Sequence, residues 1–231
     1  MSKRDYPEIK VCGLTRPEQA QACVELGADA IGVVFYSRSP RNVSVEQAAA
    51  IRAVVPPSTA LVGVVVEPSL AWLRDTTAQC GLDAIQLHGA ESPAYVRELR
   101  RAVSTKIIKV LFDQRPPEMH TAGDYPADSF LVECGRGPLP GGNAMAWDWG
   151  AAKSFAARHP LILAGGLGPE TVEQAIAAAQ PDAVDASSAL EAQPGLKDLA
   201  KVERFIESVR RSAIHYASGA RPLRPIFASG S

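Results

Sequence analysis

Residues 27–33 read GADAIGV, and residues 81–87 echo them as GLDAIQL. Each stretch begins with a glycine that follows a helix-length amphipathic segment, and glycine suits the left-handed position just past a helix end. A short, nearly continuous apolar run comes next, which is typical of a strand that is buried on both faces. The joint therefore predicts a helix that leads directly into a buried strand, the repeating step of an α/β fold.

The same step recurs along the chain. Short apolar runs alternate with helix-length segments, and several of these segments begin with a polar N-cap residue, as at Thr15, Ser44 and Ser92. The spacing of about 26 residues per unit is enough for a right-handed crossover helix each time. The eight predicted strands are Ile9–Gly13, Ala30–Phe35, Ala60–Val66, Ala84–Leu87, Ile107–Leu111, Phe130–Cys134, Leu161–Ala164 and Ala183–Ala186.

A closed barrel is favoured over the alternative, an open doubly wound sheet. Eight consecutive units are present, and no dinucleotide-binding GxGxxG motif follows the first run. The predicted fold is therefore α/β, a single-domain (β/α)8 TIM barrel over residues 1–211. Residues 212–231 are rich in small residues and proline without a periodic face, so we expect a C-terminal tail that is mobile or wrapped along the surface.

Charge and composition exclude several classes of protein. The 231 residues include 24 Lys and Arg against 25 Asp and Glu, so neither nucleic acid nor a membrane is an expected partner. The N-terminus lacks a signal-peptide pattern, and no run approaches the roughly 20 apolar residues that span a bilayer, so we expect a cytoplasmic protein. A monomer and a homodimer are both compatible with the even charge distribution. Four widely spaced cysteines and the lack of metal-binding or nucleotide-binding motifs predict neither a metal site nor a cofactor.

Two turns at the ends of the seventh and eighth runs predict a phosphate site. Active sites of these barrels lie at the C-terminal ends of the strands, and phosphate commonly binds at the last two loops. Gly165 and Gly166 follow the seventh run, and Ser187, Ser188 and Ala189 follow the eighth, where a short helical stretch begins. Backbone N–H groups at such turns attract anions, although Gly-Gly can serve only as a tight turn. We therefore expect a small phosphorylated substrate.

Cys12 and Glu133 are the candidate catalytic residues. Cys12 ends the first run with Lys10 and Arg16 nearby in the sequence, which favours a thiolate facing the anion site. The alternative is a buried thiol that packs as a small hydrophobic group. Glu133 ends the sixth run on the opposite wall, and a base facing an acid suits an isomerase that moves a proton between carbons while a ring opens or closes.

Two further residues at the strand ends suit substrate binding. Arg41 lies in the loop after the second run, where its guanidinium could hold a carboxylate through two hydrogen bonds or remain a solvated surface charge. His88 follows the fourth run, where a substrate contact and a hydrogen-bonded core histidine are both open interpretations.

The strand ends also carry motifs of a known family. From roughly Ile9 to Arg210, the sequence resembles the phosphoribosylanthranilate isomerases, which are (β/α)8 enzymes of tryptophan biosynthesis. The motifs are KVCGLT at residues 10–15, GVVFYSRSPR at 32–41, QLHG at 86–89, LAGGL at 163–167, VDASS at 184–188 and PGLKD at 194–198.

The resemblance implies an Amadori rearrangement of N-(5-phosphoribosyl)anthranilate, in which the sugar ring opens to an imine and an enolamine then tautomerises to an aminoketose. Cys12 would be the general base, and Glu133 stands where the family has its general acid. Arg41 would hold the anthranilate carboxylate, and Asp185 would orient the site. The phosphate would be bound by backbone groups at Gly165, Gly166, Ser187 and Ser188.

Three positions depart from the family's motifs. Glu133 replaces an aspartate that is one methylene shorter, and Ala189 replaces a glycine. The glycine-rich loop after the sixth run lacks its Thr-Gly and carries Asn143 and Ala144. Since all three lie at the expected site, two alternatives stay open: a related isomerase or lyase for a different phosphosugar, and a barrel that binds a phosphosugar without catalysis.

Overall fold

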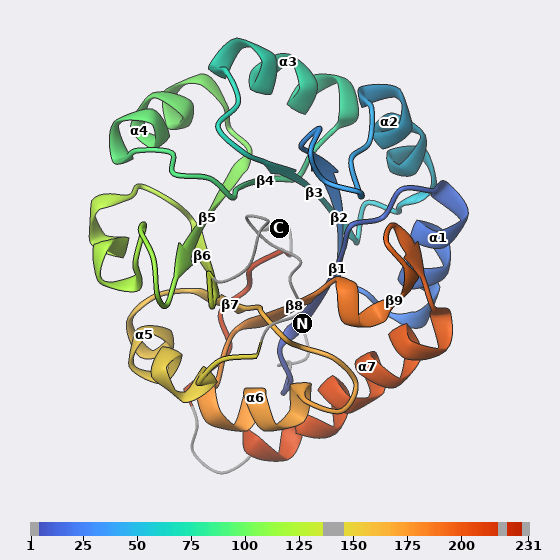
Figure 1. Ribbon diagram of the computed structural model, residues 1–231, viewed down its shortest axis with the longest axis vertical. Helices are drawn as coiled ribbons and strands as arrows, with labels where there is room; N and C mark the ends of the chain where they lie inside the picture. Colours follow the sequence, from blue (N-terminus) through green and yellow to red (C-terminus); the bar gives the residue numbers. More distant parts are fainter. Residues whose placement is uncertain (1–4, 136–145, 217–220, 228–231) are drawn as a thin grey trace.

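The computed structural model describes residues 5–135, 146–216 and 221–227, and these form a closed barrel of eight parallel strands. Figure 1 shows the strands as an inner ring and the helices as an outer layer. Each strand pairs with the next, and β1 also pairs with β8, so the predicted (β/α)8 barrel is confirmed and the open sheet is excluded. The strands are β1 (Glu8–Cys12), β2 (Ala30–Phe35), β3 (Ala60–Val65), β4 (Ala84–Leu87), β5 (Lys106–Phe112), β6 (Ser129–Glu133), β7 (Leu161–Leu163) and β8 (Ala183–Ala186).

Helices connect most of the strands. The α-helices are α1 (Pro17–Leu26), α2 (Val45–Val54), α3 (Leu70–Cys80), α4 (Pro93–Ala102), α5 (Lys153–Arg158), α6 (Val172–Ala179) and α7 (Leu199–Arg211). Between β5 and β6 the 3-10 helix η1 (Met119–Asp124) takes the place of an α-helix. In the part of the chain that is described, no helix has the length and apolarity needed to cross a membrane.

Shorter elements complete the described chain. They are the 3-10 helices η2 (Trp149–Ala152), η3 (Ser188–Leu190) and η4 (Ser212–His215), and the antiparallel strands β9 (Glu191–Gln193) and β10 (Leu196–Lys197). The strands β9 and β10 follow β8 directly, so they lie on the side of the barrel where the strands end.

The helix-to-strand joint has the geometry that its sequence predicts. Gly27 and Gly81 end α1 and α3 with φ of 112° and 59°. The aspartate of each joint has a role that the sequence analysis did not identify, because it accepts a backbone N–H near the start of the preceding strand. The pairs are Asp29 with Ile9, Asp83 with Leu61, Asp128 with Ile107 and Asp182 with Leu161. An aspartate makes this backbone hydrogen bond at every second helix-to-strand joint, which explains why the similar stretches at residues 27–33 and 81–87 lie two units apart.

The predicted N-caps are confirmed at two of the three named positions. Ser44 and Ser92 accept the N–H of the residue three positions later and begin α2 and α4. The prediction for Thr15 is wrong, because the N-cap of α1 is Arg16, which makes no side-chain capping bond. Pro17 opens α1 with the helical φ already set. Thr15 Oγ1 instead donates to Gly195 O at 2.8 Å and ties the loops after β1 and β8 together.

Side chains alternate between an outer and an inner core. On β2, Ile31 and Val33 pack with helix residues outside the barrel, whereas Ala30 belongs to a cluster that contains no helix residue and fills the barrel. Two lysines, Lys10 and Lys109, are fully buried. Since a buried charge is costly unless it is paired, the partners of these lysines identify the polar parts of the interior.

Candidate active site

Cys12 lies at the C-terminal end of β1 with 7% of its surface exposed. Gly13 follows with φ of 82°, and its N–H donates to Gly32 O at 2.9 Å. A Cβ on Gly13 would lie 2.5 Å from Arg41 Cδ. Glycine therefore lets the chain turn sharply after Cys12 and lets Arg41 approach the same corner of the mouth.

A buried ion pair lies one layer below Cys12. Lys10 Nζ is 2.9 Å from Asp185 Oδ1, across the pairing of β1 with β8. Burial acts to lower the pKa of Lys10, but Asp185 and Cys12 outweigh it and the pKa lies above its ordinary value. Burial raises the pKa of the Cys12 thiol, although Lys10 acts in the opposite direction. At neutral pH Cys12 is therefore mainly a thiol, whereas the sequence favoured a thiolate.

Arg41 belongs to a buried cluster that the sequence analysis missed. Its Nε and Nη2 donate to the two carboxylate oxygens of Glu191 at 2.8 and 2.7 Å, and Lys197 Nζ donates to Glu191 Oε1 at 2.9 Å. Burial acts to raise the pKa of Glu191, but Arg41 and Lys197 outweigh it. Burial lowers the pKa of Lys197, so a bound anion would favour its charged form. Both partners could have been found from the sequence, because Lys197 lies in the PGLKD motif and Glu191 ends the stretch VDASSALE at residues 184–191.

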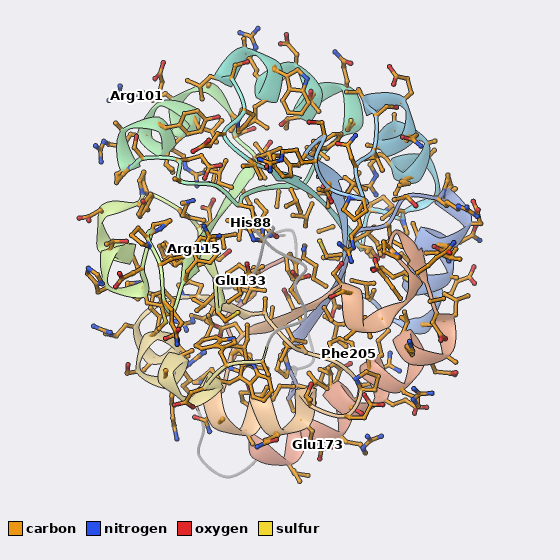
Figure 2. The ribbon with its side chains drawn as sticks, in the orientation of Figure 1. His88, Arg101, Arg115, Glu133, Glu173 and Phe205 are labelled. Carbon is orange, nitrogen blue, oxygen red and sulfur yellow. The ribbon has the colours of Figure 1, made fainter. Side chains whose placement is uncertain are left out.

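His88 and Glu133 meet on the other side of the mouth, where Figure 2 labels both at the inner edge of the ring. His88 Nε2 lies 3.1 Å from Glu133 Oε1, and His88 Nδ1 lies 3.0 Å from Gln86 Nε2. An amide nitrogen only donates, so in this arrangement Nδ1 accepts and the neutral imidazole carries its proton on Nε2, facing Glu133. Gln86, which the QLHG motif contains but the sequence analysis did not single out, thus sets the tautomer of His88.

The second buried lysine fixes the loop that follows His88. Lys109 Nζ donates to Gly89 O and to Glu91 Oε2, each at 2.7 Å. Glu91 Oε1 also accepts the backbone N–H of Glu67, so the loops after β3 and β4 are tied to each other. Burial lowers the pKa of Lys109, and Glu91 opposes this. The loop that follows His88 is therefore held by a buried ion pair on the outer face of β5.

Arg115 adds a cation to this side of the mouth. Its guanidinium lies 3.6 Å from the centre of the Phe112 ring, and Figure 2 labels it near His88 and Glu133. It comes from the proline-rich segment after β5, where no motif drew attention to it. The wall that carries Glu133 is thus not purely acidic.

The predicted phosphate-binding turns follow adjacent strands, β7 and β8. Gly165 and Gly166 have φ of 83° and 71°, and a Cβ on Gly166 would lie 2.6 Å from the backbone of Ala146. Trp147 Nε1 donates to Ala164 O at 3.0 Å, so an indole also holds this turn from the side of η2. Both the backbone conformation and the close packing therefore require glycine here.

The second turn is hydrogen-bonded directly to Cys12. Ser187 Oγ donates to Cys12 O at 2.9 Å, and Ser188 opens η3. Lys197 Nζ lies 3.2 Å from Ser187 O. Ala189 is not among the residues with positive φ, so the backbone does not require the glycine that the family has at this position.

The predicted residues thus fall into two groups. Cys12, Arg41 and Ser187 converge where β1, β2 and β8 end, and His88 meets Glu133 where β4 and β6 end. Asn143 and Ala144 lie outside the described residues. Within the described ranges, no group of three or more His, Cys, Asp or Glu side chains is arranged to hold a metal ion.

Known proteins resemble this chain over nearly the whole barrel. A family model described as N-(5'phosphoribosyl)anthranilate (PRA) isomerase matches residues 9–208. The N-(5'-phosphoribosyl)anthranilate isomerase of Desulfatibacillum aliphaticivorans is 46% identical over 209 residues, which cover 90% of this chain and 95% of the relative.

Solved structures agree with the sequence match. Phosphoribosyl anthranilate isomerase from Thermotoga maritima has a TM-score of 0.82 at 34% identity, covering 89% of this chain and 99% of that chain. A phosphoribosyl anthranilate isomerase in complex with reduced 1-(o-carboxyphenylamino)-1-deoxyribulose 5-phosphate has a TM-score of 0.77 at 34% identity, with the same coverage. Sequence and topology together place the chain in one family: it belongs to the N-(5'-phosphoribosyl)anthranilate isomerases.

Proposed function

We propose that this chain converts N-(5'-phosphoribosyl)anthranilate into 1-(2-carboxyphenylamino)-1-deoxyribulose 5-phosphate in tryptophan biosynthesis, as the family name implies. The observation that carries the proposal is the position of Cys12 on β1 and Glu133 on β6, two proton-transferring groups on different walls of one mouth. An Amadori rearrangement needs an acid at the ring oxygen and a base at the neighbouring carbon, and this pair supplies both.

In the first step, the carboxyl group of Glu133 gives its proton to the ring oxygen of the substrate. The bond between that oxygen and C1 breaks, and the lone pair of the anthranilate nitrogen forms the C=N bond of an iminium ion. The sugar chain is then open, and Glu133 is a carboxylate.

In the second step, the thiolate of Cys12 removes the proton on C2. The electrons of that C–H bond form a C=C bond, and the C=N electrons return to nitrogen to give the enolamine. Tautomerisation then gives the aminoketose. The proton of Glu133 is now on the former ring oxygen, and the proton of C2 is on Cys12. In the tautomerisation the hydroxyl on C2 loses a proton and C1 gains one. Transfer of a proton from the Cys12 thiol to the Glu133 carboxylate through solvent restores the enzyme, so no oxidant, metal or cofactor enters the balance.

His88 acts through Glu133 in this scheme and is a positioning residue. The hydrogen bond from His88 Nε2 engages Oε1 of the carboxyl group, which leaves Oε2 to face the ring oxygen. The extra methylene of Glu133, compared with the family's aspartate, is thereby held in one orientation. A half-turn of the Gln86 amide would present Oε1 to an Nδ1–H group, and His88 Nε2 could then accept the carboxyl proton of Glu133. Gln86 Oε1 is buried without a hydrogen-bond partner among the described residues, so the amide is not locked on that side.

The remaining predicted residues bind the ends of the substrate. Arg41 holds the anthranilate carboxylate with the guanidinium N–H groups that Glu191 does not engage. Asp185 keeps Lys10 charged beneath Cys12, which favours the thiolate when the base is needed. The phosphate lies against backbone groups of Gly165, Gly166, Ser187, Ser188 and Ala189.

The decisive experiment measures turnover of phosphoribosylanthranilate by the decay of its fluorescence and by chromatography of the product. We expect turnover by the unaltered chain and a large loss in both Cys12→Ser and Glu133→Gln. No turnover, or turnover that survives both substitutions, would overturn the proposal. Phosphate-dependent thermal stabilisation without turnover would instead support a barrel that binds a phosphosugar without catalysis.

Two expectations from the sequence stay predictions. The chain is expected to be cytoplasmic, and sedimentation velocity would distinguish the expected monomer from the homodimer. The substrate proposed above requires neither a nucleic acid nor a membrane.

A further inference from the structure

The N-terminal mouth of the barrel, opposite the candidate site, is lined by unusually small side chains. Four strands begin with alanine, and these alanines belong to the cluster that fills the barrel: Ala30, Ala60, Ala84 and Ala183. The interior of a (β/α)8 barrel is usually filled by layers of bulky branched side chains. Alanine at four strand starts leaves the last layer at this end without such filling from the strands themselves.

The missing volume is supplied by residues from the far end of the chain. Ile226 and Phe227 belong to the same cluster as the four alanines and are each 4% exposed. In Figure 1 the red segment that contains them crosses the ring of strands. Two large apolar side chains therefore occupy the space that the alanines leave.

The backbone of this segment is also recognised. Glu8 Oε2, at the start of β1, accepts the N–H groups of Ile226 at 3.0 Å and Phe227 at 2.6 Å. Lys106 Nζ, at the start of β5, donates to Ile226 O at 2.8 Å. Buried backbone groups need such partners, and here they come from side chains that face the mouth.

Two arginines of the segment bind the same carboxylate, in addition to the contacts with Glu8 and Lys106. Asp182 is fully buried, and its carboxylate accepts from Arg221 Nη1 at 2.5 Å and from Arg224 Nε and Nη2 at 3.1 and 2.9 Å. Arg224 also donates to the carbonyl oxygens of Ala156 and His159, before β7. The segment thus contacts the starts of β1, β5, β7 and β8 through charge-assisted hydrogen bonds.

We propose that the N-terminal mouth is a peptide-binding socket and that its occupant is the chain's own segment 221–227, which closes the barrel as a plug. The distance that the chain must span supports its own tail as the occupant. Tyr216 Oη donates to Pro181 O at 2.7 Å, and Arg221 binds the adjacent Asp182. Only the four residues 217–220 separate these two anchors in the sequence.

The plug is separate from the proposed chemistry. The family model matches residues 9–208, so the occupant lies outside the matched part of the chain. On the inner face of β1, Glu8 holds the plug, Lys10 lies one layer above it and Cys12 lies at the far end. With a full layer between them, the plug stabilises the barrel without touching the substrate.

A matched pair of substitutions in the full chain tests the plug. Ile226→Ala removes a buried side chain, and Ile214→Ala removes the same side chain where it is 67% exposed. We expect Ile226→Ala to lower Tm by about 5–10 °C, a typical effect of deleting buried methyl groups in a domain of this size, with kcat/KM at 25 °C unchanged within twofold. The control should lower Tm by no more than about 2 °C. Equal shifts in the two variants would overturn the proposal.

A second experiment asks whether the socket recognises the segment. A chain that ends at Tyr216 should melt at a lower temperature than the full chain, and a synthetic peptide of residues 217–231 should restore Tm in a saturable way. The same peptide with Ile226→Ala and Phe227→Ala should not restore it. A dimer that forms only with the tail, or equal rescue by both peptides, would overturn the intramolecular plug. If the shortened chain does not fold, the comparison of Ile226→Ala with Ile214→Ala in the full chain still tests the proposal.

Discussion

The two mouths of the barrel are made from opposite ends of the same strands, yet their charged groups have different surroundings. At the C-terminal mouth, burial raises the pKa of Cys12 and lowers the pKa of Lys197, so a proton or an anion can change the charge of either group. At the N-terminal mouth, the carboxylates of Glu8 and Asp182 accept hydrogen bonds from residues 221–227. The charges of the C-terminal mouth can therefore change with protonation or ligand binding, whereas the N-terminal mouth is filled by residues 221–227.

This contrast indicates that residues at the C-terminal mouth serve the reaction and residues at the N-terminal mouth serve the stability of the barrel. Strand β8 makes the point within a few residues. Asp182 beside its start binds the arginines of the tail, whereas Asp185 within it pairs with Lys10 below the proposed catalytic thiol. Substitutions at the C-terminal mouth should therefore change rates, and those at the N-terminal mouth should change melting temperatures.

The largest expected effect comes from one substitution made at two cysteines. Cys12→Ser should lower kcat/KM by about 10²–10⁴-fold, because a hydroxyl is a much poorer base than a thiolate. Cys23→Ser makes the same change inside α1, where the side chain is fully buried in the outer core. It should lower Tm and leave kcat/KM within about twofold. Kinetics and thermal melts of both variants check this, and loss of activity in both would contradict the separation.

The next largest effect is expected from two aspartates, Asp182 just before β8 and Asp185 within it. Asp182→Asn removes the charge that pairs with Arg221 and Arg224, and we expect a loss of about 2–4 kcal/mol in the free energy of unfolding, since breaking a buried pair leaves charges uncompensated. Its kcat/KM should stay within about threefold. Asp185→Asn should reduce kcat/KM at least tenfold, because Lys10 loses its partner below Cys12. Urea unfolding and steady-state kinetics measure both; a rate loss only in Asp182→Asn would reverse the assignment of the two mouths.

A smaller effect is expected where His88 positions Glu133. His88→Asn and Gln86→Met should each lower kcat by about 10–100-fold with KM little changed, because the carboxyl group loses its orientation but the substrate loses no contact. A rise in KM at constant kcat would instead support the substrate contact that the sequence left open for His88. Thermal melts of both variants exclude unfolding as the cause of a lower rate.

The sequence predicts the barrel because its signals are local. The glycine at each joint ends a helix, the apolar run that follows is buried on both faces, and these features recur often enough to close a ring. The aspartate in the same joint was visible but its role was not, because its partner lies on the preceding strand. Thr15 shows the limit of local rules, since a proline opens the helix and the threonine donates to Gly195 in the loop after the neighbouring strand β8.

The site could be predicted where motifs cover it and not where distant segments meet. Cys12, Arg41 and His88 lie at strand ends within recognisable motifs, and Glu133 ends the sixth predicted strand. Glu191 lies in the stretch VDASSALE, but its role appears only when Arg41 comes within 2.7 Å. The socket for residues 221–227 is harder still to predict from the sequence. The alanines that start four separate strands line a common space only once the strands form a ring.

The pH dependence of the Cys12 thiol provides the fourth prediction. In the proposed scheme Cys12 acts as a base only after it has lost its proton, and burial raises its pKa above the ordinary value of a thiol. Below that pKa the thiolate fraction rises about tenfold per pH unit, so iodoacetamide should alkylate Cys12 faster at each step from pH 6 to pH 9. Cys12→Ser gives the background from the other cysteines, and an alkylation rate that is flat over this range would contradict the raised pKa. Melting temperatures recorded at each pH keep the effect separate from unfolding.

The smallest effect is expected at Ala189, where the chain departs from the family's glycine. If glycine were needed there, Ala189 would adopt a left-handed conformation, yet its φ is not positive. Ala189→Gly should therefore change KM and kcat by less than about twofold, because it relieves no strain and adds only unfolded-state freedom. Gly166→Ala is the matched control at the other predicted phosphate turn, where φ is 71° and the new Cβ would lie 2.6 Å from the backbone of Ala146. It should raise KM and lower Tm; a gain of activity in Ala189→Gly would show that the methyl group obstructs the phosphate after all.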